Sequence, residues 1–316
     1  MIARSRGNVE IRRVSELDRW TFRASDLFPQ ITEHELRAAS AILGDRFFDQ
    51  QSHAIVLAIH TYVVRIGTTT VLVDTGNGNG RDRPNLVAHH MFETDYLERL
   101  RAARIQPDDV DLVICTHLHP DHCGWNTTLR SGTWRPTFPR AEYLFHRPEF
   151  EAMRDLVIGG ADNGVQADLI RMWNDSVQPV LDEGRWGLID TDCVLAAEGD
   201  AVITARTAPG HTTGHLIIDI DEAGGGSILC GDVIHHPLQL LFPYLSQGGD
   251  SDPSQAAETR AALLRRCIHE GKTMLTAHFP AGVEVSFDSQ ENTYTCLGDN
   301  HSEARASRAQ NQLLIG

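Results

Sequence analysis

Basic residues are scarce in this chain of 316 residues, in which 28 Lys and Arg stand against 43 Asp and Glu and leave a formal charge of −15. A nucleic-acid partner needs a basic face that offsets phosphate charge, so the shortage argues against nucleic-acid binding. No run approaches the about 20 apolar residues of a membrane helix, and Met1–Arg6 leads into polar sequence rather than the apolar stretch of a secretory signal. We therefore expect a cytoplasmic protein without a membrane partner.

Cysteine motifs are also missing, because the six cysteines are scattered and include no Cys-x-x-Cys pair. This scatter suits a reducing compartment. The stretch Gly76–Gly80 is rich in glycine, but it lacks the G-x-G-x-x-G spacing of dinucleotide-binding loops. We expect a flexible loop there and no nucleotide cofactor. Hydrophobic residues make up 41% of the chain, enough for a sizeable core.

Strand and helix patterns alternate along the chain. Ala54–Arg65 and Thr69–Asp74 are rich in β-branched residues and predict two strands joined at Gly67. Helices are predicted over Thr94–Arg104, Arg147–Val157, Gln166–Asn174 and Ser254–Glu270, the last with Ser254 as its cap. Further short strands are predicted over His215–Ile220, Ser227–Cys230 and Thr273–Thr276.

Three segments are expected. Residues 1–52 form an N-terminal arm packed on the main domain, residues 53–299 form that domain, and residues 300–316 form a polar tail. In the arm, Thr32 and Glu35 predict a helix that begins with a capping box. The arm either packs at an edge, covers the substrate, or meets a second subunit of a homodimer, and these alternatives stay open.

The segment Thr116–His122 gathers metal-binding side chains at the end of a predicted strand. His117, His119, Asp121 and His122 offer imidazole nitrogen and carboxylate oxygen, which suit zinc or a similar borderline metal. Four donors in one short loop are hard to aim at a single tetrahedral ion, which favours two metals. The alternative is a polar loop exposed to solvent, although the density of donors argues against it.

The pattern His-x-His-x-Asp-His resembles the metallo-β-lactamase superfamily, and other landmarks of that family follow in order. These are Asp74-Thr75-Gly76, Pro209–His215, Cys230-Gly231-Asp232 and Ala277–Pro280. The resemblance covers about residues 54 to 285. It implies an α/β fold, the four-layer αββα sandwich of that superfamily, here with an N-terminal extension.

The resemblance also implies a set of metal ligands. His117, His119 and His211 would hold one ion, Asp121, His122 and His278 the other, and Asp232 would bridge both. The expected cofactors are two zinc ions per chain, with manganese, iron or cobalt as alternatives. Such a centre lowers the pKa of water and holds a hydroxide nucleophile at neutral pH.

Four more roles are expected around these ligands. Asp121 is the candidate to orient the nucleophile and pass its proton to the leaving group. Asp74 and His215 would hold the ligands in place, and a purely structural role stays open for His215. His235 occupies the position at which acyl-homoserine lactonases that resemble this chain commonly carry a tyrosine. Its imidazole would serve as a hydrogen-bond donor or proton shuttle, or else pack behind the site.

The predicted activity is therefore metal-dependent hydrolysis of a small molecule, by opening a lactone or cleaving a carboxylic ester. Acyl-homoserine-lactonase-like chemistry belongs to this prediction. One alternative is a phosphotriesterase-like hydrolase of the methyl parathion hydrolase type. Another is a glyoxalase II-type thioesterase, although no cluster of basic residues stands out for the glutathione carboxylates. A metal-binding scaffold without turnover is the remaining alternative.

Overall fold

A computed structural model describes residues 3–6, 8–49, 51–52, 54–223, 225–280, 284–288, 293–297 and 304–305. The chain divides into two compact units, each built from separate stretches of sequence. The first unit comprises Met1–Leu17 and Ile59–Gly199, and the second comprises Asp18–Ala58 and Asp200–Gly316. The predicted division at residues 52 and 299 remains a prediction.

Most of a seven-stranded sheet, in the order β1-β2-β3-β4-β5-β8-β9, belongs to the first unit, whereas residues 18–22 and 55–58 of its strands belong to the second. Its strands are β1 Ala3–Arg6, β2 Val9–Phe22, β3 Ile55–Ile66, β4 Thr69–Val73, β5 Leu112–Ile114, β8 Glu142–His146 and β9 Trp186–Ile189. The pair β3 and β4 is antiparallel, as expected for two strands joined at Gly67, whereas β4, β5, β8 and β9 run parallel to one another. Parallel strands need crossover connections, which here carry the helices.

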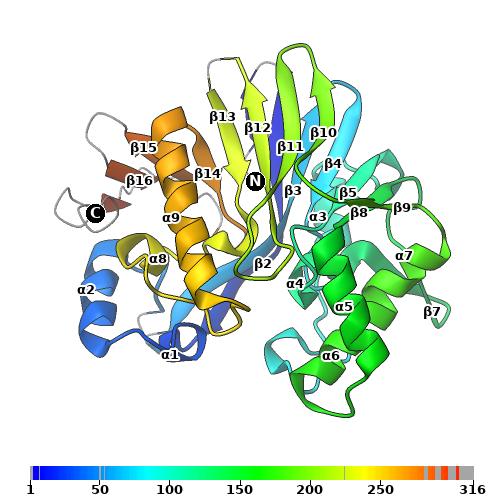
Figure 1. The fold of residues 1–316 in the computed structure, drawn as a ribbon, viewed down its shortest axis with the longest axis horizontal. Coiled ribbons are helices and arrows are strands. Elements are labelled where there is room, and N and C mark those ends of the chain that lie inside the picture. Colours follow the sequence, from blue (N-terminus) through cyan, green and yellow to red (C-terminus); the bar gives the residue numbers. More distant parts are fainter. Residues whose placement is uncertain are drawn as a thin grey trace. The chain divides into compact units, whose positions relative to one another are not determined.

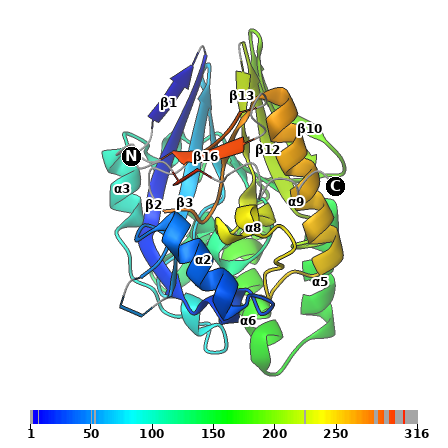
Figure 2. The ribbon, with the colours of Figure 1, turned by 90° about the vertical axis from the view of Figure 1, so that its left-hand side faces the viewer.

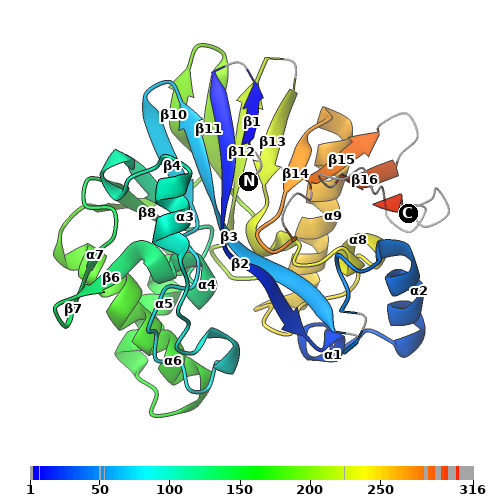
Figure 3. The ribbon, with the colours of Figure 1, turned by 180° about the vertical axis from the view of Figure 1, so that it is seen from behind.

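Helices cover the sheet of the first unit. They are α3 Tyr96–Ala102, α4 Pro120–Cys123, α5 Arg147–Gly159, α6 Gly164–Met172 and α7 Gln178–Asp182. Shorter helical turns span Val87–His89, Pro107–Asp109, Gly124–Asn126 and Trp173–Val177, and the hairpin β6 Thr127–Arg130 and β7 Thr133–Pro136 stands apart from the main sheet. Figure 3 shows α3 lying against the strands, and its Tyr96 and Leu100 belong to one buried cluster with Val63 and Val113. This cluster is the core of the first unit.

The second sheet has the order β10-β11-β12-β13-β14-β15-β16-β17, and its strands β11 to β17 belong to the second unit. Its strands are β10 Cys193–Glu198, β11 Ala201–Thr207, β12 Leu216–Glu222, β13 Gly225–Leu229, β14 Thr273–Leu275, β15 Glu284–Asp288, β16 Thr293–Leu297 and β17 Ala304–Arg305. The helices are α1 Ala24–Leu27, α2 Glu33–Leu43, α8 Leu238–Leu241 and α9 Pro253–Glu270, with a 3₁₀ turn at Gly231–Val233. Helix α9 packs on the sheet through Leu263 and Cys267 (Figures 1 and 2).

Two helix starts test the capping predictions. Helix α2 begins at the expected capping box, because the Thr32 hydroxyl accepts from the Glu35 amide at 3.2 Å and the Glu35 carboxylate accepts from the Thr32 amide at 2.9 Å. The prediction for α9 was wrong. Its cap is Asp252, whose carboxylate accepts from the Gln255 amide at 3.0 Å, and Pro253 fills the first helical position ahead of Ser254.

Among the described residues, no helix combines the length and the apolar character needed to cross a membrane.

Candidate metal centre

In the first unit, two neighbouring parallel strands deliver polar residues to the same edge of the sheet. Val73 at the end of β4 is paired with Ile114 at the end of β5. Asp74 and Thr116 therefore leave the sheet side by side. The Thr116 amide donates to Asp74 Oδ1 at 2.7 Å, and the Thr116 hydroxyl donates to Asp74 Oδ2 at 3.0 Å. Asp74 adopts a left-handed φ of 58°, a conformation that Asp tolerates better than most residues.

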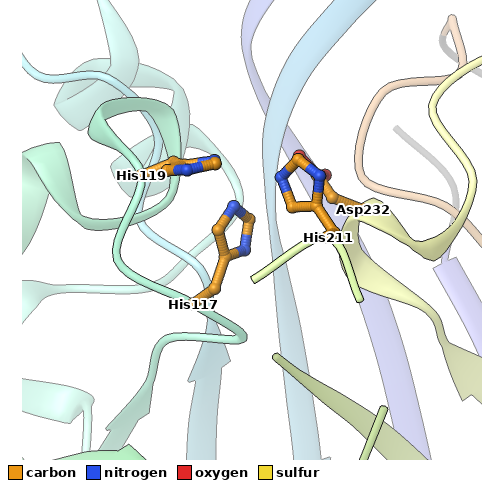
Figure 4. A group of neighbouring side chains, drawn as sticks. All are labelled: His117, His119, His211 and Asp232. Atoms are coloured by element: carbon orange, nitrogen blue, oxygen red, sulfur yellow. The ribbon is translucent and has the colours of Figure 1, made fainter. Parts of the chain in front are cut away.

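The loop that follows β5 holds four candidate metal ligands in a small volume. His117 and His119 project from the loop itself (Figure 4), whereas Asp121 and His122 lie on the single turn of α4. The His117 ring centroid lies 4.5 Å from that of His119 and 4.0 Å from that of His122. The imidazoles of His117 and His122 are buried, and so is the Asp121 carboxylate. The donors that the sequence predicted are thus gathered within this unit.

Hydrogen bonds select the ring nitrogen that two of these histidines offer. His122 Nδ1 lies 2.9 Å from Asp74 Oδ2, which can only accept, so this nitrogen carries the proton. The Thr116 hydroxyl donates its proton to Asp74, so it accepts a hydrogen bond from His117 Nδ1 at 3.1 Å. Both rings therefore keep the lone pair on Nε2, the arrangement of metal-binding histidines.

In the second unit, three loops likewise carry candidate ligands away from strand ends at one edge of a sheet. Strand β13 runs parallel to β14 and antiparallel to β12, which is antiparallel to β11. The carboxyl ends of β11, β13 and β14 therefore share one edge, and the chain leaves them towards His211, Asp232 and His278. Gly210 is needed beside His211, because it has a φ of 132° and a Cβ there would lie 2.3 Å from the Ala256 amide nitrogen.

Asp232 is the centre of this second group. Its Oδ2 lies 3.3 Å from His211 Nε2, and its Oδ1 lies 3.0 Å from His278 Nε2. Figure 4 shows the His211 ring beside the Asp232 carboxylate. His278 Nδ1 faces the Ala58 carbonyl oxygen at 2.9 Å, which requires a proton on Nδ1. The Nε2 lone pair of a neutral His278 thus faces a carboxylate oxygen, and a cation or a proton has to lie between them.

Two further contacts hold this group in place. His211 Nδ1 lies 2.8 Å from the buried Asp250 carboxylate. Burial opposes ionisation of Asp250, but the hydrogen bond with His211 and the nearby charges of His235, His211 and Arg260 together keep the pKa of Asp250 below its usual range. The Asp232 amide donates to Nε2 of the fully buried His215 at 3.0 Å. His215 thereby fixes the backbone of Asp232.

His235 lies against Asp232. Its Nε2 is 3.1 Å from Asp232 Oδ2, and its ring stacks on that of His278 with centroids 5.7 Å apart and an interplanar angle of 14°. Gln239 fixes its backbone, because Gln239 Oε1 accepts from the His235 amide at 2.8 Å. Burial lowers the pKa of His235, so the ring is neutral near pH 7. The side chain touches the candidate ligand directly.

Three residues in contact with this machinery had not been singled out from the sequence. Thr116 stood at the start of the motif without a role, and it now links Asp74 to His117. Glu149 on α5 is buried and accepts from the Leu118 amide at 3.0 Å, which braces the loop between His117 and His119. Asp250 orients His211. Glu149 and Asp250 belong to no motif, so no local signal could have identified them.

Comparison with known proteins extends these observations. The sequence profile of the metallo-beta-lactamase superfamily matches residues 54–278. The N-acyl homoserine lactonase AiiB of Agrobacterium fabrum is 34% identical over 218 residues, which are 65% of this chain and 74% of that protein. Among solved structures, the hydrolase AbOPH of the beta-lactamase superfamily matches with a TM-score of 0.72 at 21% identity, over 95% of this chain and 97% of that one.

A third similar protein is AidC, a dizinc quorum-quenching lactonase solved with the product N-hexanoyl-L-homoserine. It matches with a TM-score of 0.68 at 18% identity, over 97% of each chain. These matches confirm the predicted α/β fold class, that of the metallo-β-lactamases. The chain belongs to the metallo-beta-lactamase superfamily and is a hydrolase of that superfamily.

Proposed function

We propose that this chain hydrolyses a lactone or a carboxylic ester of a small molecule with the help of two divalent metal ions. The observation that carries the proposal is the Asp232 carboxylate, which turns each oxygen towards the Nε2 of a different histidine. A carboxylate placed in this way suits a bridge between two cations. Its two partners, His211 and His278, would then serve different ions.

The proposed ligands fall into two groups. The first comprises His117, His119, His211 and Asp232, and the second comprises Asp121, His122 and His278. Asp232 would in addition bridge the two ions. Histidine nitrogen and carboxylate oxygen suit zinc best, with manganese, iron or cobalt as alternatives. Bound divalent ions of this kind lower the pKa of water and polarise the carbonyl of an ester.

The chain's own residues would handle the proton. The Asp121 carboxylate takes it from the attacking water and returns it to the oxygen of the leaving alcohol. His89 lies close to this carboxylate, with its Nδ1 3.9 Å from Asp121 Oδ1 and 2.9 Å from Asn77 Oδ1. His235 Nε2 lies 3.1 Å from Asp232 Oδ2, so its ring would help to keep the bridging carboxylate in place.

The lactone is favoured as substrate by the 34% identity to the homoserine lactonase AiiB. One residue favours a second candidate, a phosphotriester. His235 stands where the related homoserine lactonases commonly carry a tyrosine, which suggests a different set of contacts at the substrate. A phosphotriester could be attacked in line by the same activated water.

A substrate panel tests the proposal. Purified protein with two equivalents of zinc would be offered N-acyl homoserine lactones, simple γ-lactones, aryl esters, phosphotriesters and a glutathione thioester. The highest kcat/KM is expected for a lactone or an aryl ester. A preference for the phosphotriester would favour the second candidate, and a preference for the thioester would contradict both. Metal-loaded protein without turnover on any of them would indicate a scaffold.

The His235→Phe variant separates chemistry from packing. The phenyl ring keeps the stacking on His278 but has no nitrogen to face Asp232, so we expect kcat/KM to fall about 10- to 100-fold while both metals stay bound. Elemental analysis and steady-state kinetics on the same preparation measure the two quantities. A rate equal to that of the unchanged protein would assign His235 to packing alone.

The Asp74→Asn variant tests the choice of tautomer at His122. The asparagine amide can present its NH₂ group to His122 Nδ1 and so draw the proton onto Nε2, which would then be lost as a ligand. We expect metal affinity to fall about 10- to 100-fold. Competition with a chromophoric zinc chelator measures it. Asp111→Asn, at the exposed opposite end of β5, is the matched control and should leave the affinity unchanged.

A further inference from the structure

A buried carboxylate from the N-terminal strand lies beneath the glycine-rich loop of the first unit. Glu16 on β2 is 1% exposed. Its carboxylate accepts four hydrogen bonds, from the Asn77 amide at 2.6 Å, the Gly78 amide at 3.1 Å, the Trp125 indole Nε1 at 2.6 Å and the Thr94 hydroxyl at 3.4 Å. Glu16 is thus one of the side chains that hold the loop Gly76–Gly80, for which the sequence predicted flexibility, and Asn77 and Asn79 make further bonds to His89 and Thr94.

This loop supports the segment that carries Asp121 and His122. The Thr75 amide donates to the His122 carbonyl at 2.8 Å, and the Gly124 amide donates to the Gly76 carbonyl at 2.7 Å. Gly124 and the glycine-rich loop are in such close contact that a Cβ on Gly124 would lie 1.9 Å from the Asn77 carbonyl oxygen. Glu16 therefore reaches the candidate ligands through one layer of backbone, without touching them.

We propose that Glu16 is a positioning residue for the metal centre, and that its negative charge sets the geometry of the Asp121–His122 turn through Gly76–Gly78 and Trp125. The proposal rests on the proposed function, because it takes Asp121 and His122 as metal ligands. The Asn77 amide, the Gly78 amide and the Trp125 indole can only donate, so the ionised carboxylate satisfies all three. The Thr94 hydroxyl also lies 3.1 Å from Asn79 Oδ1 and can donate there instead. A protonated acid or an amide brings a donor of its own into this set of donors and weakens the acceptor that they share.

The pKa of Glu16 lies close to neutral pH. Burial raises its pKa to about 7, against the lowering effect of the hydrogen bonds from Asn77 and Trp125. The ionisable groups that face it are Arg81 and Tyr96, whose own pKa values respond to its charge, and His89, which is bonded to Asn77. A folded pKa above the model-peptide value means that the folded state loses stability as the pH rises from about 4.5 to about 7. Above about pH 7 Glu16 is therefore charged at a cost in stability.

The Glu16→Gln variant tests the proposal, with Glu93→Gln as the matched control because Glu93 is exposed beside the same loop. Tryptophan fluorescence of the full-length, metal-free protein would be followed from pH 5.5 to 8.5. We expect a transition with a midpoint near 7 in the unchanged protein and in Glu93→Gln. The transition should be absent in Glu16→Gln and in Trp125→Phe, since Trp125 is the indole bonded to the carboxylate.

Zinc affinity at pH 8 and the thermal midpoint complete the test. For Glu16→Gln we expect the weaker of the two zinc ions to bind about tenfold less tightly, with a thermal midpoint no lower than that of the unchanged protein. Unchanged zinc affinity together with a persisting fluorescence transition would overturn the proposal. So would a lowered midpoint with unchanged affinity, because that pattern marks a structural role.

A Glu16→Gln chain that fails to fold would leave the decision to the unchanged protein and Trp125→Phe, where the absence of a transition near pH 7 overturns the proposal. Failure of the proposed function looks different. In that case the unchanged protein itself binds fewer than two zinc ions or hydrolyses none of the panel. If it binds two and turns over, the comparison with Glu16→Gln tests the positioning role alone.

Discussion

Replacing Asp232 with alanine is expected to lower both metal occupancy and kcat/KM more than any other single change. Its two oxygens face His211 and His278, so their loss removes a ligand from both proposed ions at once. We expect kcat/KM to fall by more than the about 100-fold that loss of an outer hydrogen-bond partner can cost, and bound metal to fall below two per chain. Elemental analysis and steady-state kinetics on the preferred panel substrate measure both.

Asp200→Ala is the matched control for this variant, because Asp200 is an exposed aspartate just ahead of β11 in the same unit. It should keep full metal content and full rate. The backbone at Asp232 is held by His215 through its amide, which the substitution leaves intact. A loss of the fold is therefore not expected, and circular dichroism checks this. Normal occupancy and rate in Asp232→Ala would refute the proposed centre.

Removal of the metals by dialysis against a strong chelator should also lower both activity and stability by a large amount. We expect activity to fall by at least about 100-fold, because the described residues around the candidate site would have to activate water without a cation. Stability should fall as well. A ligand present at a hundredfold excess over its Kd stabilises the folded state by about 2.7 kcal/mol, and that contribution disappears with it.

Reloading the stripped protein separates the candidate cofactors. Zinc, manganese, iron(II) and cobalt would be added back singly, with thermal midpoint and kcat/KM measured for each. Recovery of both quantities with one metal identifies the ion that the site prefers. Magnesium serves as the control, since a centre rich in imidazole nitrogen should bind it poorly. Activity that survives complete metal removal would contradict the proposed chemistry.

The sequence predicted the candidate metal-binding residues more fully than the contacts that hold them in place. The sequence predicted the α/β fold class and the strands on either side of Gly67, and both are confirmed. The cap of α9 was misplaced by two residues, because Ser254 and Asp252 are both good caps and only Pro253 decides between them. The assignment of the ligands remains a proposal.

Amino-acid type by itself determined which side chains can bind a metal, because coordination depends on the donor atom and a short loop keeps several donors together. Tertiary structure alone decided what holds those donors. Asp250 reaches His211 across 39 residues, and Glu16 reaches Asn77 across 61. Such partners meet only after segments far apart in the sequence have packed together. That packing depends on strand pairing between distant segments, which leaves no local pattern in the sequence.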